Sequence, residues 1–140
     1  MMTSAIPFAT EAWVQRFKVE INASEDYRRA AKNWEGDFLF VVEPDAVNPR
    51  PISMYVDLYH GQCRQAFLVS DSVVPRAEFV ISASMRVWQA VAQKQLDPIK
   101  ALLTRQLKLT GNMAKIMRNV KAANELVNCT TRFDTQFPAG

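Results

Sequence analysis

The chain has 140 residues, of which 49% are hydrophobic and 22% charged, and it carries a net charge of +3. This length and composition predict one globular domain, spanning 1–140 with a core at about 10–132. The two cysteines lie far apart and neither belongs to a CxxC motif, so we expect no disulfide framework and a cytoplasmic setting. We also expect neither a signal peptide nor a membrane span, because no segment approaches the ~20 apolar residues that a span needs.

Two helices are predicted at the start of the chain. Thr10 is a suitable N-cap for the first, whose apolar residues recur at helical spacing: Trp13, Phe17 and Ile21. Ser24 can cap the second helix, and Gly36 is expected to end it.

Four strands are expected next, at 37–42, 52–59, 62–69 and 78–83. The strand at 52–59 alternates clearly, with one side formed by Ile52, Met54, Val56 and Leu58. His60 and Gly61 predict the turn of a hairpin. Loops are expected at the proline-rich segment 44–51 and at 71–76.

The second half changes to helical periodicity. Ser84 can cap a helix that contains Trp88, and Asp97-Pro98 is typical of a helix start. The apolar face of this next helix would consist of Ile99, Leu102 and Leu103. A short strand at 107–110 precedes one final helix from about Asn112, with a stripe formed by Met113, Ile116, Met117, Val120, Ala123 and Val127. The predicted fold class is therefore α+β, a mainly antiparallel five-stranded sheet covered by helices on one face.

Positive charge is concentrated in one part of the chain. The segment 86–121 contains eight basic residues and a single acidic one, Asp97. Such a segment can face an anionic membrane surface, nucleic acid or an acidic partner, or be a solvated surface without any partner. Nucleic acid is the weaker choice, because the basic residues are spread singly and no exposed aromatic residues are interleaved with them.

The sequence contains no clear catalytic, metal-binding or phosphate-binding motif. His60 is the only histidine and lies in the predicted turn, and Cys63 follows three residues later in a strand, where it would point to the opposite face. No third group is available to orient this pair, the ligands of a zinc site are lacking, and the four glycines form no phosphate-binding loop. We therefore expect no catalytic residues, no metal and no cofactor.

An ordered set of motifs resembles a known family. Phe79 to Ser84 is followed by a Trp-containing helix, then by Lys94-Gln-Leu-Asp97-Pro98, and finally by a Leu-Lys-Leu-Thr-Gly-Asn run at 107–112. This order resembles the sterol carrier protein-2 (SCP-2) sterol transfer family over roughly residues 10–130. Trp34-Glu-Gly36, before the first strand, is similar to bacterial single-domain members. The end of the chain is not a peroxisomal tripeptide, which fits the cytoplasmic expectation.

The resemblance implies a non-enzymatic protein that binds a fatty acid, fatty acyl-CoA, sterol or other lipid in an apolar tunnel between sheet and helices. Methionines suit such adaptable walls. On spacing alone, the stripe at Met113, Met117 and Val120 fits an ordinary core better than a ligand wall, and the resemblance makes the two interpretations about equal. The expected tunnel residues are Phe40, Met54, Val56, Phe79, Ile81, Trp88, Leu103, Leu109, Met113, Met117 and Val120.

Two other functions remain open. The domain could be an accessory module that presents a hydrophobic substrate to a separate enzyme. It could also be a structural or dimerising domain with a filled core, since edge strands of a small sheet can pair across a homodimer.

Overall fold

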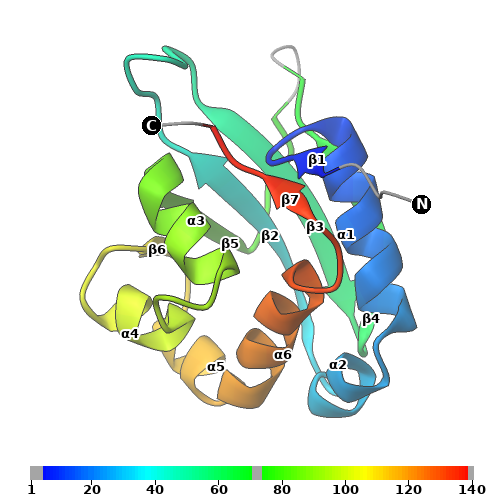
Figure 1. The fold of residues 1–140 in the computed structure, drawn as a ribbon. Helices are drawn as coiled ribbons and strands as arrows, with labels where there is room; N and C mark the ends of the chain where they lie inside the picture. The colour runs from blue at the N-terminus through cyan, green and yellow to red at the C-terminus, as the bar shows by residue number, and fades with distance from the viewer. Residues whose placement is uncertain (1–4, 71–73, 139–140) are drawn as a thin grey trace.

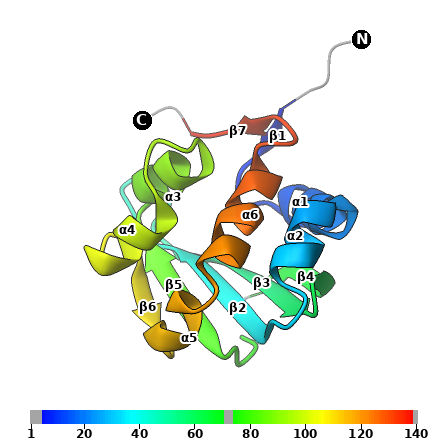
Figure 2. The same cartoon turned by 90° about the horizontal axis from the view of Figure 1, so that it is seen from below.

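The computed structural model describes residues 5–70 and 74–138, which form a sheet with helices packed on one of its faces (Figures 1 and 2). The five strands of this sheet are β2 (Glu35–Val42), β3 (Ile52–Tyr59), β4 (Gln62–Leu68), β5 (Phe79–Ala83) and β6 (Lys108–Thr110). The helices are α1 (Glu11–Ala23), α2 (Glu25–Ala30), α3 (Met85–Ala92), α4 (Pro98–Leu103), α5 (Met113–Met117) and α6 (Val120–Thr130). In Figure 2, α6 lies between α1 and α2 on one side and α3 and α4 on the other.

The strand order is β4-β3-β2-β5-β6. The pairs β3–β4, β2–β3 and β5–β6 are antiparallel, whereas β2 and β5 are parallel, with Phe38 opposite Phe79. The predicted fold class is therefore confirmed. The strands β2 to β5 are not arranged across the sheet in their order along the chain, however, because β5 lies beside β2 and not beside β4.

Local capping explains where the helices begin. In each of five helices, the side chain before the first residue accepts a hydrogen bond from a backbone N–H of the first turn, as expected of a good N-cap. These caps are Thr10, Ser24, Ser84, Asp97 and Asn112. Thr10, Ser24, Ser84 and Asp97 were predicted as caps, and Asn112 was predicted as the approximate start of a helix.

Two predicted boundaries are wrong. The second helix ends at Ala30, and Gly36 lies inside β2, where a Cβ atom would approach the rings of Phe79 and Trp34 to 3.1 and 3.2 Å. Gly36 therefore allows ring packing and does not end a helix. The single final helix is two helices, because Asn119 between them departs from helical geometry (φ −129°, ψ 38°).

A second, two-stranded parallel sheet joins the ends of the described chain. It pairs β1 (Ile6–Pro7) with β7 (Thr135–Gln136), and the indole Nε1 of Trp13 donates to Thr135 Oγ1 at 2.9 Å. This sheet closes one end of the helical layer (Figure 1). Its strands are too short for any sequence periodicity, so it was not predicted. Part of the loop expected at 71–76 lies outside the described residues.

Candidate functional site

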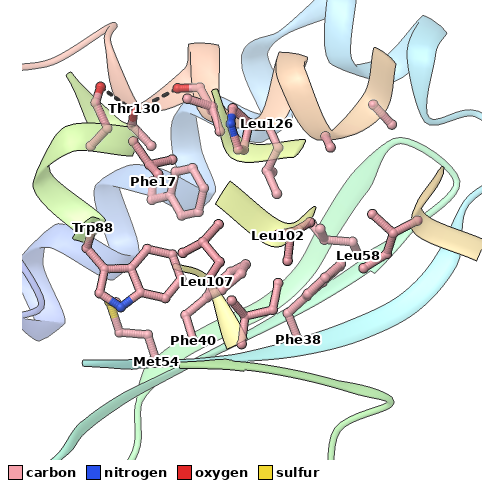
Figure 3. A pocket seen from close by; sticks show the side chains of 18 of the residues that line it. Phe17, Phe38, Phe40, Met54, Leu58, Trp88, Leu102, Leu107, Leu126 and Thr130 are labelled. Atoms are coloured by element: carbon pink, nitrogen blue, oxygen red, sulfur yellow. Dashed lines mark hydrogen bonds between the residues drawn. The ribbon is translucent and has the colours of Figure 1, made fainter. Parts of the chain in front are cut away.

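An apolar cavity of about 130 Å³ lies between the inner face of the sheet and the helical layer. Its floor comes from β2, β3 and β5, and its walls come from the helices α1 to α6 (Figure 3). The floor residues follow from strand alternation: Phe38, Phe40, Met54, Leu58 and Ile81 point inward, while their neighbours in sequence point to the opposite face.

Aromatic rings form a continuous surface along this floor. The rings of Phe38 and Phe40 are stacked with centroids 5.3 Å apart, and Trp34 continues the stack at 5.8 Å from Phe38. At the other end, Trp88 of α3 meets Phe40 edge-on at 5.6 Å, beside Met54 (Figure 3). Such offset and edge-on pairs are favourable arrangements of aromatic rings.

The polar atoms of the walls are mostly turned away or already bonded. The indole N–H groups of Trp34 and Trp88 donate to the backbone carbonyls of Gly36 and Val41, at 3.0 and 2.9 Å. The hydroxyl of Thr130 donates to Val127 O at 2.7 Å (Figure 3). None of the described lining residues is charged. The cavity therefore presents ring faces and aliphatic carbon to its contents.

One side of the cavity is closed and the other is more open. On the side of α1 and α2, Trp13, Phe17 and Tyr27 are at most 4% exposed. On the side of α3, α4 and α6, the lining residues Ala92, Pro98 and Ala123 are only half-buried. Val91 and Leu102 on this side are buried, so the half-buried positions are local, and we expect any entrance to lie beside them.

The model of the SCP-2 sterol transfer family matches residues 15–124. The chain belongs to this family. A crystal structure of sterol carrier protein 2 is 38% identical over 90% of this chain and 98% of that chain, with a TM-score of 0.83. A conserved hypothetical protein from Thermus thermophilus, described as possibly a sterol carrier protein, is 35% identical over 99% of this chain and 97% of that chain, with a TM-score of 0.85.

The same fold also occurs inside a larger enzyme. A sec-alkylsulfatase from Pseudomonas sp. matches 86% of this chain but only 15% of its own length, at 15% identity and a TM-score of 0.51. This likeness concerns the fold alone. No curated protein matches this chain. The family match over residues 15–124 confirms the resemblance drawn from the sequence.

Four of the eleven tunnel residues expected of this SCP-2 member line the cavity: Phe40, Met54, Ile81 and Trp88. The other seven lie outside its lining: Val56, Phe79, Leu103, Leu109, Met113, Met117 and Val120. Val56 and Phe79 are enclosed in the packed core, whereas Leu103 is 64% exposed at the end of α4. Contact of any of these residues with a ligand stays a prediction.

Several lining residues were not foreseen. Trp13 and Phe17 were recognised as a helical stripe, but nothing in the sequence places α1 against the same cavity as α3. Ala123 and Val127 belonged to the predicted stripe of the last helix, yet Leu126 did not. The predicted stripe ran through both helices as if they were one; its members Ile116, Ala123 and Val127 line the cavity, whereas Met113, Met117 and Val120 do not.

His60 and Cys63 do not form a reactive pair. His60 Nε2 lies 2.7 Å from Glu35 Oε2 at the surface, and its ring stacks on Tyr59. Cys63 is 3% exposed, and burial raises the pKa of its thiol to about 12. A thiol of this kind is not a nucleophile near neutral pH. Within residues 5–70 and 74–138, no three His, Cys, Asp or Glu side chains gather in a way that could hold a metal ion.

The basic segment 86–121 includes α3, α4, α5 and the start of α6, and several of these helices contribute to the more open side of the cavity. Lys108 and Lys115 are paired with Glu43 and Glu78. The remaining basic side chains of the segment are exposed on or beside α3 to α6: Arg86, Lys94, Lys100, Arg105, Arg118 and Lys121. Lys94 also contacts Asn128, which links the end of α3 to α6. Among the described residues, no helix has the length and apolar character needed to cross a membrane.

Proposed function

We propose that this protein binds a hydrophobic, lipid-like ligand in the cavity beneath α6 and carries it without catalysing a reaction. The observation that carries this proposal is the uncharged, largely apolar lining of the cavity. Each methylene group moved from water into such a site gains about 0.8 kcal/mol. A chain of ~12 methylenes would therefore gain roughly 10 kcal/mol before the costs of ordering are subtracted.

Family membership supports the same function. The matching family is that of SCP-2 sterol transfer proteins, and the similar Thermus protein is described as possibly a sterol carrier. The identity of the lipid is left to experiment, because apolar walls accept acyl chains and fused rings alike.

The volume of the cavity indicates how a lipid would fit. At about 130 Å³ the cavity is close to the ~150 Å³ engineered cavity that holds a benzene molecule. A longer ligand must therefore extend through the entrance or push α3 and α4 away from α6. Two side-chain links join the end of α3 to α6: the Lys94–Asn128 contact, and the longer arm, at 3.4 Å to Ala92 O, of the bifurcated hydrogen bond that Thr130 Oγ1 donates mainly to Val127 O. Moving α3 away from α6 would break both links.

The exposed basic residues support a docking role for the same side of the molecule. Anionic lipid attracts each Lys or Arg near its surface with about 1 kcal/mol. An entrance bordered by Lys100, Arg118 and Lys121 would be held against an anionic membrane, where a lipid could enter or leave.

An accessory role is the alternative, favoured by the occurrence of this fold within the Pseudomonas sulfatase. In that role the domain would present a hydrophobic substrate to a separate enzyme. Recovery of one enzyme in stoichiometric amount with the tagged protein, and its loss when the cavity is filled, would support the alternative over a free carrier.

The proposal is tested by native mass spectrometry of protein purified without detergent, followed by organic extraction. An adduct with the mass of a fatty acid, alcohol, isoprenoid or sterol is the expected result. An unliganded mass that stays unchanged after incubation with acyl and sterol ligands would contradict lipid binding.

A further inference from the structure

Tyr27 places a polar group on the closed side of the cavity. The residue lies in α2, is 2% exposed and belongs to the lining, opposite the entrance. Its backbone N–H is bonded to Ser24 Oγ at 3.0 Å, but its hydroxyl forms no hydrogen bond with any described residue.

We infer that this hydroxyl borders the cavity. Among the described residues, Tyr27 included, no fully enclosed side-chain oxygen or nitrogen lacks a hydrogen-bond partner. The Tyr27 oxygen has no partner and is therefore not fully enclosed, and because the residue is 2% exposed and lines the cavity, we take the cavity to be the space beside it. A buried hydroxyl without a partner is costly, and a ligand that supplies one removes this cost.

The surroundings of Tyr27 define the chemistry of that partner. Burial, with Cys63 and Cys129 nearby, raises the pKa of the phenol, so it stays neutral and can both donate and accept. The lining offers no cation to balance an ionised headgroup, and an unpaired charge would be strongly disfavoured there. The group that fits is a neutral oxygen.

We propose that the Tyr27 hydroxyl binds a single neutral hydroxyl or carbonyl oxygen at the inner end of the ligand, and that the cavity therefore prefers alcohols and ketones over hydrocarbons of the same shape. This inference rests on the proposed function, and it adds a polar selection to a site that is otherwise apolar. A carboxylate would have to remain at the entrance, near the basic residues.

The test compares 1-decanol with decane, using the emission of the cavity tryptophans as the signal of binding. Tyr27→Phe removes the oxygen and keeps the ring. We expect this variant to weaken decanol binding by about fivefold to tenfold, as for the loss of one hydrogen bond, and to leave decane binding unchanged. Tyr55→Phe is the matched control, because Tyr55 donates to Asp37 on the opposite face of the sheet. It should change neither affinity.

The outcomes separate the two proposals. If Tyr27→Phe affects both ligands equally or neither, while the wild type binds both, the inference is overturned and the carrier function stands. If the wild type binds neither ligand, the proposed function fails and the inference fails with it. Should Tyr27→Phe not fold, the wild type with ¹³C-labelled tyrosine provides the answer. The Cζ resonance of Tyr27 should move with decanol and not with decane, and an equal shift with both would contradict the hydrogen bond.

Discussion

The side chain of Asn22 is bonded to both backbone polar groups of Cys63. Its Nδ2 donates to Cys63 O at 3.0 Å, and its Oδ1 accepts from Cys63 N–H at 2.8 Å. Cys63 lies in β4, an edge strand of the sheet, and these are the bonds that a further strand would make. From the same helix, Glu11 accepts from Leu68 N–H, and Gln15 donates to Ala66 O. Helix α1 thus covers the edge with side chains in place of a strand.

The first prediction removes this cover. Asn22→Ala would leave two backbone groups of the edge unpaired, and we expect a loss of about 1–3 kcal/mol in the free energy of unfolding. The uncovered edge should also increase self-association, because such an edge is a template for pairing with another chain. Urea denaturation and light scattering measure the two effects. Asn124→Ala, at an exposed position of α6, is the control and should change neither.

Lys115 provides the second prediction. Its Nζ donates to Glu35 O and to Glu78 Oε2 at 2.5 and 2.7 Å, and it lies 5.0 Å from the ring centre of Trp34. It therefore fastens α5 to the sheet beside the cavity floor. Lys115→Ala should cost about 1–3 kcal/mol in chemical denaturation. Exposed Lys121→Ala should stay within about 0.5 kcal/mol, and equal losses in both variants would contradict the structural role of Lys115.

Local features of this fold could be predicted because their causes are local. The cap at Asp97 and the alternation from Ile52 to Tyr59 depend on residues only a few positions apart. The six residues of α4 were too few to show which leucine faces inward, so Leu103 was assigned to the wall although it is exposed. The side chain of Asn119 does not cap α6, so no capping motif indicates the break at this residue.

The cavity depends on contacts between distant segments, and this is why much of it was missed. Tyr27 and Trp88 are far apart in sequence and become walls of one site only because β5 inserts beside β2. Strand periodicity shows that Met54 and Val56 share a face. It cannot show that one lines the cavity and the other lies within packed core.

The third prediction fills the cavity. Ala123 lines it from α6, whereas the next residue, Asn124, is exposed. Ala123→Phe should abolish the lipid adduct in native mass spectrometry, or weaken ligand affinity by at least about tenfold, with a stability cost of about 1–3 kcal/mol from overpacking. Asn124→Phe introduces the same ring on the outside and should retain the adduct. Unchanged binding by Ala123→Phe would exclude this cavity as the ligand site.

The fourth prediction concerns the basic segment. Replacing Lys100 and Lys121 by Glu should weaken binding to vesicles of mixed phosphatidylserine and phosphatidylcholine by at least about tenfold, since each lysine near an anionic surface contributes about 1 kcal/mol. Lys18 and Lys32, on or after α1 and α2, provide a control pair with the same change in net charge. Co-sedimentation at two salt concentrations measures the effect. Equal losses in the two double variants would indicate a response to net charge and not a docking face.

The fifth prediction follows from the buried thiol of Cys63. Its pKa is raised by burial from an ordinary value near 9 to about 12 in the folded protein. The folded state therefore keeps this proton at a pH where the unfolded chain has released it, and the free energy of unfolding should fall as pH rises above 9. The slope from one such group approaches ~1.4 kcal/mol per pH unit. The measurement is urea denaturation at several pH values between about 8 and 10.5. Cys63→Ala should be less stable than the wild type at the lower pH, but its stability should fall less steeply above pH 9. The slope that remains would come from Cys129 and Tyr27, whose pKa values are also raised by burial. Parallel curves for the wild type and the variant would show that ionisation of Cys63 does not contribute.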